Sequence, residues 1–185
     1  MRIVLMGPPG AGKGTQAVVV AAQLGIAHVS TGDIFRANVA AGTPLGVEAK
    51  RFMDAGEYVP DHVTNSMIRQ RLAEADCEPG FLLDGYPRTL DQVTVLDEIV
   101  GSDPLDRVVE MTVDTDELIR RLHLRALDQG RTDDNVDVIR HRMEVYVAQT
   151  EPLTAVYADR GLLVRVDGMG AVEDVTSRIL AALAR

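Results

Sequence analysis

A glycine-rich segment near the amino terminus carries the strongest chemical signal in the sequence. It reads GPPGAGKGT over residues 7–15, which gives Lys13 the G-x-x-x-x-G-K spacing. Glycines let the backbone curl until successive N–H groups face an anion, and a helix that starts here adds positive potential. The segment therefore predicts a loop that binds the phosphates of a nucleoside triphosphate. A hydroxyl residue usually follows the lysine; here Gly14 does, and Thr15 carries the hydroxyl.

The elements around this loop must place it at the edge of a sheet. Residues 2–6 suit a strand buried on both faces, and residues 13–24 suit a helix that ends at Gly25. Further strands are expected at 27–30, 80–84, 107–113 and 162–166, and further helices at 34–41, 44–55, 61–74, 89–100, 116–125, from 136 onward, and at 171–183. This alternation predicts an α/β fold of three layers, α/β/α, around a five-stranded parallel sheet.

Length, charge and cysteine content limit the class of protein. The 185 residues, 46% of them hydrophobic, suffice for one domain with a buried core. The net charge of −9 argues against a general nucleic-acid or membrane binder. A single cysteine, Cys77, allows no internal disulfide, and no export signal or membrane-spanning run is evident. We therefore expect a cytoplasmic protein, with a passive role for Cys77.

Two interpretations of the glycine-rich loop lie outside phosphoryl transfer. A switch GTPase would read guanine with Asn-Lys-x-Asp, but no asparagine in this chain is followed by lysine. A glycine-rich turn that binds no ligand is the other interpretation. The expected strand before the loop and helix after it argue against such a turn.

Further motifs make a family recognisable. STGDIFR spans residues 30–36, FLLDGYPRT spans 81–89, and Gln92 follows. Together with GPPGAGKGT they resemble adenylate kinases, along the whole chain and in the bacterial form with a very short lid. The resemblance implies reversible transfer of the terminal phosphoryl group of ATP to AMP, giving two ADP. A UMP/CMP kinase of the same fold and a non-catalytic nucleotide-binding regulator are the alternatives.

The resemblance also divides the chain into parts. It implies a core P-loop kinase domain at residues 1–29, 60–125 and 135–185, a small helical insertion at 30–59 that binds the nucleoside monophosphate (NMP), and a short lid at 126–134. Mg²⁺ is expected with ATP, held through water by Asp84 at the end of a strand. Larger lids in the family can hold zinc on cysteines; this lid has neither the length nor the cysteines, so no zinc is expected.

Residues that match the family's AMP site come from several stretches. Thr31 and Gln92 match the residues that read adenine, and UMP/CMP kinases usually differ at both. Arg36 and Arg88 match residues that bind the AMP phosphate. The full set implied for AMP is Thr31, Arg36, Glu57, Tyr58, Val59, Gly85, Tyr86, Pro87, Arg88, Gln92, Arg131 and Arg142. Taken singly, Thr31 could simply cap a helix, and Gln92 could lie on an exposed helix face.

Six arginines between residues 120 and 142 make that stretch locally positive. Arg121 matches a guanidinium that stacks on the adenine of ATP, although Glu117, four residues earlier, is an alternative partner. The set implied for ATP is Gly10, Ala11, Gly12, Lys13, Gly14, Thr15, Arg121, Arg125 and Gly170. The implied catalytic set is Lys13, Arg88, Arg131 and Arg142. A glycine usually precedes the arginine matched by Arg125, and Leu124 stands there, so the register of Arg125 stays open.

The resemblance implies small-molecule partners: ATP, AMP and ADP. We expect no nucleic-acid partner, no membrane association and a monomer. The acceptor phosphate has a second pKa of about 6, so it is already ionised at neutral pH and needs no general base. Catalysis would then consist of positioning and charge neutralisation.

Overall fold

The computed structural model describes residues 1–129 and 136–184, without the side chains of 125–129 and 136. Its sheet consists of β1 (Arg2–Met6), β2 (Ala27–Ser30), β3 (Phe81–Asp84), β4 (Arg107–Thr112) and β5 (Leu163–Asp167). The strand order is β2-β3-β1-β4-β5, and each neighbouring pair is parallel. The predicted five-stranded parallel sheet is confirmed, and the carboxyl ends of its strands share one edge.

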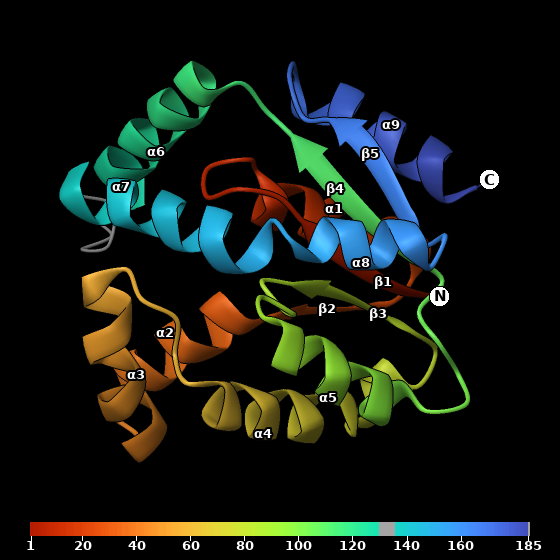
Figure 1. Ribbon diagram of the computed structural model, residues 1–185, viewed down its shortest axis with the longest axis horizontal. Coiled ribbons are helices and arrows are strands. Elements are labelled where there is room, and N and C mark those ends of the chain that lie inside the picture. The colour runs from red at the N-terminus through yellow and green to blue at the C-terminus, as the bar shows by residue number, and fades with distance from the viewer. Residues whose placement is uncertain (130–135, 185) are drawn as a thin grey trace.

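Helices cover both faces of this sheet (Figure 1). On one face lie α1 (Lys13–Leu24) and α9 (Val172–Leu183), which pack on each other. On the other lie α4 (Asp61–Leu72), α5 (Leu90–Val100) and α8 (Leu153–Asp159). The chain therefore has the three layers expected from its sequence.

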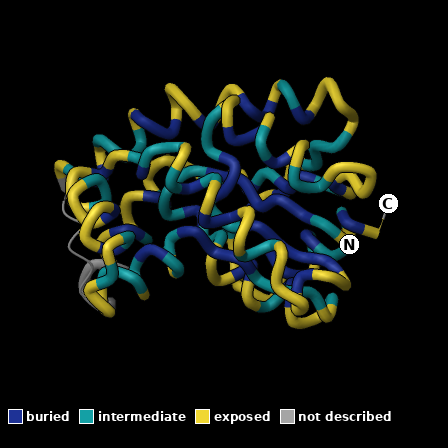
Figure 2. Tube along the Cα trace, turned by 90° about the horizontal axis from the view of Figure 1, so that it is seen from below, coloured by how far each residue is buried: buried dark blue, intermediate teal, exposed yellow. Residues whose placement is uncertain are grey.

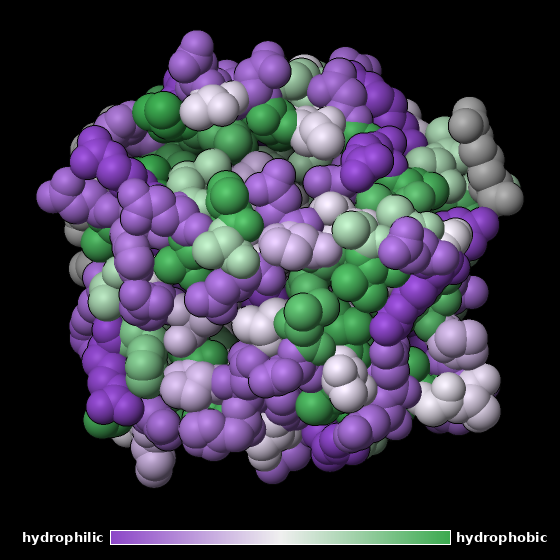
Figure 3. All heavy atoms as spheres, viewed as in Figure 1, coloured by the Kyte–Doolittle hydropathy of each residue, from purple (hydrophilic) through white to green (hydrophobic). Residues whose placement is uncertain are grey.

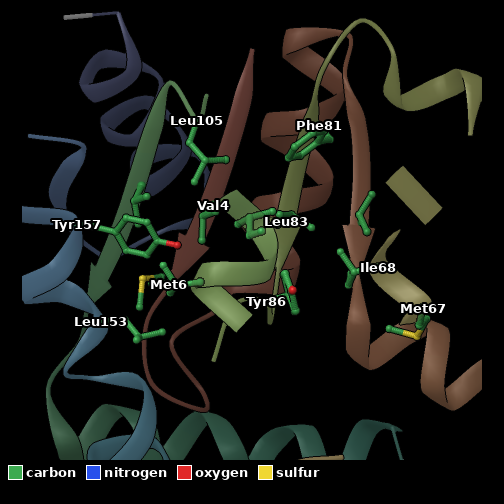
Figure 4. Close-up of a cluster of buried hydrophobic side chains, with 14 of the residues drawn as sticks. Val4, Met6, Met67, Ile68, Phe81, Leu83, Tyr86, Leu105, Leu153 and Tyr157 are labelled. Carbon is green, nitrogen blue, oxygen red and sulfur yellow. The ribbon is translucent and has the colours of Figure 1, made fainter. Parts of the chain in front are cut away.

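The central strand β1 explains why the sheet needs cover on both sides. Ile3 and Leu5 join the core under α1 and α9, whereas Val4 and Met6 join the core on the opposite face. All four are at most 3% exposed. Figure 4 draws the second core, where Val4 and Met6 lie near Tyr157 of α8. Buried residues accordingly follow the strands, and exposed ones follow the outer turns of the helices (Figure 2).

Two helix pairs extend beyond the same edge of the sheet (Figure 1). The first is α2 (Thr31–Ala41) with α3 (Pro44–Ala55), which lie within the expected insertion. The second is α6 (Thr115–Gln129) with α7 (Val136–Val145). Helix α2 is capped by the residue before it: Ser30 Oγ accepts a hydrogen bond from Asp33 N at 3.2 Å.

The helical boundaries after residue 115 differ from those expected. Helix α6 runs to Gln129 and not to about Arg125, because the polar residues there are compatible with a helix and the next glycine is Gly130. The long helix expected from residue 136 ends at Val145. A π-helical turn, Tyr146–Thr150, follows it, and α8 begins after that. No element had been expected at α8.

Cys77 lies in a 3-10 turn, Ala75–Cys77, between α4 and β3. It is 3% exposed, and Arg71 Nη1 donates to its Sγ at 3.1 Å. Burial raises the pKa of the Cys77 thiol, against the effect of the neighbouring Arg71 charge.

Hydrophilic side chains dominate the face in Figure 3, where hydrophobic residues form small groups between them. Over the described residues, helices long and apolar enough to cross a membrane are absent.

Candidate active site

Glycines with left-handed backbone shape the loop between β1 and α1. Gly10 has a φ of +86°, and Gly12, which caps α1, has a φ of +91°. A Cβ atom at Gly10 would lie 2.9 Å from Leu122 Cγ and 3.0 Å from the carbonyl oxygen of Leu118. The loop thus packs on α6 through its backbone, which explains the need for glycine there.

Two pockets adjoin at the carboxyl ends of the strands. The larger pocket has a volume of about 680 Å³ and is lined by the residues expected for ATP: Gly10, Ala11, Gly12, Lys13, Gly14, Thr15, Arg121 and Gly170. The smaller pocket has a volume of about 120 Å³ and is lined by those expected for AMP: Thr31, Arg36, Glu57, Tyr58, Val59, Gly85, Tyr86, Pro87, Arg88, Gln92 and Arg142. The fold therefore gathers each set around its own pocket.

Among the side chains that the structure describes, four basic ones line both pockets: Lys13, Arg36, Arg88 and Arg142. They come from α1, α2, the loop after β3, and α7. Like charges brought together repel, so this boundary favours an anion. A phosphoryl group that passes from one pocket to the other would lie among these side chains.

The side chain of Lys13 folds back onto the loop that precedes α1. Its Nζ donates to the carbonyl oxygens of Gly7 at 2.7 Å and Pro8 at 2.9 Å. The amine is therefore held against the backbone of the loop, and Lys13 lines both pockets.

Arg121 is fixed by three groups at the mouth of the larger pocket. Its Nη1 donates to Ala11 O at 3.2 Å, its Nη2 to Gly168 O at 3.0 Å, and its Nε to Glu117 Oε1 at 2.7 Å. The pKa of Glu117 is about 2, below its ordinary value, because Arg120 and then Arg121 donate to its carboxylate. The Glu117 pairing that the sequence left open is thus formed, and it places Arg121 in the pocket wall.

Arg88 is oriented by neighbours in the smaller pocket. Its Nε donates to Gly85 O at 2.8 Å, and its guanidinium carbon lies 4.9 Å from the centre of the Tyr58 ring. Tyr58 Oη and Thr150 Oγ1 are 2.7 Å apart, and Thr150 Oγ1 donates to the carbonyl of Arg88 at 2.9 Å. Thr150 therefore ties the ring to the backbone of the arginine that stacks on it.

Thr31 and Gln92 are buried, with exposures of 2% and 1%. Thr31 Oγ1 donates to Gly85 O at 3.0 Å, so the hydroxyl joins two walls of the smaller pocket. Gln92 lies in a hydrogen-bond network with Asp61 and the backbone of Arg88 and not on an exposed helix face.

Two residues that line the smaller pocket, Arg36 and Glu57, pair with ionisable side chains outside its lining. Arg36 Nη2 lies 2.6 Å from Asp33 Oδ1. Burial raises the pKa of Asp33, but the hydrogen bond and charge of Arg36, with the hydrogen bond to Ser30, together outweigh burial and the pKa is lowered. Glu57 Oε1 pairs with His141 Nε2 of α7, and this hydrogen bond raises the pKa of His141. The carboxylate of Glu57 thus pairs with α7.

Asp84 provides a carboxylate at the end of β3 within the larger pocket. Its side chain is 13% exposed, and a Cβ at Gly14 would lie 3.5 Å from Asp84 Oδ2, so glycine keeps the space before the carboxylate open. Thr15 adds a hydroxyl oxygen to the same pocket. One carboxylate, a hydroxyl and phosphate oxygens are the hard donors that suit Mg²⁺. Groups of three or more His, Cys, Asp or Glu placed to hold a metal do not occur among the described residues.

The expected lid is only partly described. Residues 126–129 continue the backbone of α6, and Arg131 lies outside the described residues. The side chain of Arg125 also lies outside them, so its register stays a prediction.

Sequence reasoning missed the residues that hold the site together. Asp61 accepts from both Gln92 and Thr89, and Thr150 joins Tyr58 to Arg88. An acidic residue in the first turn of α4 was a visible signal, but it also fits helix-dipole stabilisation. Nothing in the local sequence distinguishes Thr150.

The arrangement belongs to P-loop kinases, in which a donor and an acceptor nucleotide meet at shared positive charge. A family model of adenylate kinases matches residues 5–162. The adenylate kinase of Nocardioides sp. is 58% identical over 99% of this chain and 97% of its own length. That of Kocuria rhizophila is 57% identical over 100% and 99%, and that of Pseudarthrobacter chlorophenolicus is 55% identical over 98% and 96%. The chain belongs to the adenylate kinase family.

Proposed function

We propose that this chain transfers the γ-phosphoryl group of ATP, bound in the larger pocket, to AMP, bound in the smaller pocket. As an adenylate kinase it is an ATP:AMP phosphotransferase. The observation that carries the assignment of the pockets is the set of basic side chains, Lys13, Arg36, Arg88 and Arg142, that lines both. Donor and acceptor phosphates would meet there.

The chain's own residues act by position and charge. Arg88, oriented by Gly85 O and the Tyr58 ring, would bind the AMP phosphate. Lys13 would exchange the carbonyl oxygens of Gly7 and Pro8 for phosphate oxygens of ATP. Arg131 and Arg142 would neutralise the transferred group, as the family resemblance implies. No side chain has to remove a proton, because the phosphate of AMP has a second pKa of about 6.

Asp84 and Thr15 are the residues that would hold Mg²⁺, Asp84 through water. The ion would supply charge neutralisation at the phosphates of ATP. The donor set supports this proposal, and the space left by Gly14 beside the Asp84 carboxylate fits it.

The assignment of domains is also a proposal. Residues 1–29, 60–125 and 135–185 form the core, 30–59 the part that binds AMP, and 126–134 the lid. Helices α2 and α3 supply Arg36 and Met53 to the smaller pocket, which supports the role of residues 30–59. We further propose a cytoplasmic monomer without a nucleic-acid partner, since one chain forms both pockets and carries a net charge of −9.

A coupled assay tests the function directly. ATP is offered with AMP, CMP, UMP or GMP in turn, and ADP formation is followed. We expect turnover with AMP far above that with the other three. Turnover highest with CMP or UMP would instead identify a pyrimidine nucleotide kinase, and binding without turnover would identify a regulator. Sedimentation of the active sample tests whether it is a monomer.

A further inference from the structure

The side-chain amide of Gln92 is held at both ends. Its Nε2 donates to Asp61 Oδ1 at 2.6 Å, and its Oε1 accepts from the backbone N–H of Arg88 at 2.7 Å. Asp61 is fixed in turn, because its Oδ2 accepts from Thr89 Oγ1 at 2.6 Å. An ionised carboxylate only accepts hydrogen bonds and a backbone N–H only donates them. Both neighbours therefore impose the same orientation on the amide.

We propose that Asp61 determines base specificity by holding Gln92 in the orientation that accepts a 6-aminopurine and rejects a 6-oxopurine. This inference rests on the proposed function, in which Gln92 reads the base of AMP. Asp61 acts through Gln92 and is a positioning residue.

The remaining hydrogen-bonding capacity of Gln92 matches adenine. Its Nε2 carries a second N–H and its Oε1 a second acceptor position, and the residue lines the smaller pocket. Adenine presents its amino group, a donor, beside N1, an acceptor. The amino group fits Oε1 and N1 fits Nε2, so both hydrogen bonds can form without any change at Asp61 or Arg88.

A 6-oxopurine presents the opposite pattern, a carbonyl O6 beside an N1–H donor. Facing the same amide, it would set acceptor against acceptor and donor against donor. Rotation of the Gln92 amide by half a turn would match the amide to the 6-oxopurine. It would, however, turn Oε1 toward the Asp61 carboxylate and Nε2 toward the Arg88 N–H. Gln92 is 1% exposed, so water does not compensate the mismatch. The fold thus penalises the 6-oxopurine in either orientation.

The test compares AMP with IMP, whose base carries O6 and N1–H without the 2-amino group of guanine. The ratio of kcat/KM for AMP to that for IMP is measured at saturating ATP. We expect about a 100-fold preference for AMP in the unaltered protein, which is the size seen when buried polar groups are left unpaired. Asp61→Ala should lower this preference at least tenfold, because the amide can then rotate to match O6 and N1–H, and the change should appear chiefly as a lower KM for IMP, with a smaller change in kcat.

Further variants separate hydrogen bonding from charge. In Asp61→Asn, Oδ1 can still accept from Gln92 and Nδ2 can donate to Thr89 Oγ1, so the preference should persist. Asp61→Glu keeps the charge at the start of α4 but displaces the carboxylate, so the preference should fall; it replaces Asp61→Ala if that variant does not fold. Asp91→Ala, at an exposed acid in the first turn of α5, is the matched control and should change nothing.

The outcomes distinguish the inference from the function on which it rests. A folded Asp61→Ala variant with an unchanged AMP preference overturns the role of Asp61. So does an Asp61→Asn variant that loses as much as Asp61→Ala, because charge and not orientation would then matter. Gln92→Leu should abolish the preference; if it does not, Gln92 does not read the base, and the assignment of the smaller pocket fails with it.

Discussion

The two pockets of this protein are built in different ways. The larger pocket is formed around the backbone of the β1–α1 loop, and its Arg121 is held by the main-chain carbonyls of Ala11 and Gly168. The smaller pocket is enclosed by side chains bonded to one another, as in Gln92 with Asp61 and Tyr58 with Thr150. Backbone N–H groups recognise phosphate, which all nucleotides share, whereas oriented side chains distinguish bases. The comparison predicts that selectivity is concentrated in the smaller pocket.

The largest effect is expected where the pockets meet. Arg88→Ala, like Lys13→Ala, should lower kcat by about 10²- to 10³-fold, because it removes charge from the position of the transferred phosphoryl group. The coupled assay measures this, and circular dichroism with a thermal melt checks that the variant is folded. Arg88→Lys keeps the charge without the planar fork and should recover only part of the activity. Near-normal turnover in folded Arg88→Ala would reject the role of that residue.

A smaller effect, confined to the larger pocket, is expected for Arg121→Ala. We expect the KM for ATP to rise about tenfold, because one charged hydrogen-bonding group is lost. The KM for AMP should change little. Arg165→Ala is the control, because Arg165 also pairs with a glutamate, Glu110, but lies outside the lining of both pockets. Equal effects of Arg121→Ala on both substrates would contradict the division between the pockets.

Thr150→Val is expected to affect the binding of AMP and not that of ATP. It removes the hydroxyl that joins Tyr58 to the backbone of Arg88 and should destabilise the fold by about 1–3 kcal/mol. The KM for AMP should rise several-fold while that for ATP stays constant, as initial-rate kinetics would show. Thr94→Val, at an exposed threonine whose hydroxyl donates to Leu90 O of its own helix, should leave both constants unchanged.

The smallest effect concerns the contact of Glu57 with α7. The folded pKa of His141 is raised by its hydrogen bond with Glu57 and, less strongly, by Glu144. The ion pair is therefore complete below the unfolded pKa, near 6.5, and its contribution is lost as the pH rises through the raised value. Titration of His141 by NMR should show its pKa fall in Glu57→Gln. An unchanged value would mean that the pair does not form in solution.

Local patterns were enough to predict most of the fold. The apolar run of β1 and the glycines of the loop depend on neighbouring residues, and both are predicted from the sequence. Helix α6 extends beyond the expected end at residue 125, because the polar residues that follow do not by themselves stop a helix. The π-helical turn at Tyr146–Thr150 has no comparable local signal.

In the candidate site, the residues that touch nucleotide were predictable from the sequence, whereas the residues that orient them were not. Residues expected to touch nucleotide follow from motifs, and the described ones line the pockets. The residues that orient them do not follow from motifs, because Asp61 is 31 positions from Gln92 and Thr150 is 62 positions from Arg88. Such pairs depend on how α4, α5 and the π-helical turn pack, which no short motif encodes.

Burial of Cys77 gives the protein an intrinsic reporter. The chain has one thiol, and it lies in the turn before β3 and not in the lining of either pocket. A thiol reagent can therefore modify the protein only when this turn opens, so the rate of labelling measures the population of opened molecules. Where the turn opens through global unfolding, a nucleotide that binds only the folded form should slow labelling in proportion to its saturation. Ligand affinity could then be read from unaltered protein, without turnover and without an added dye.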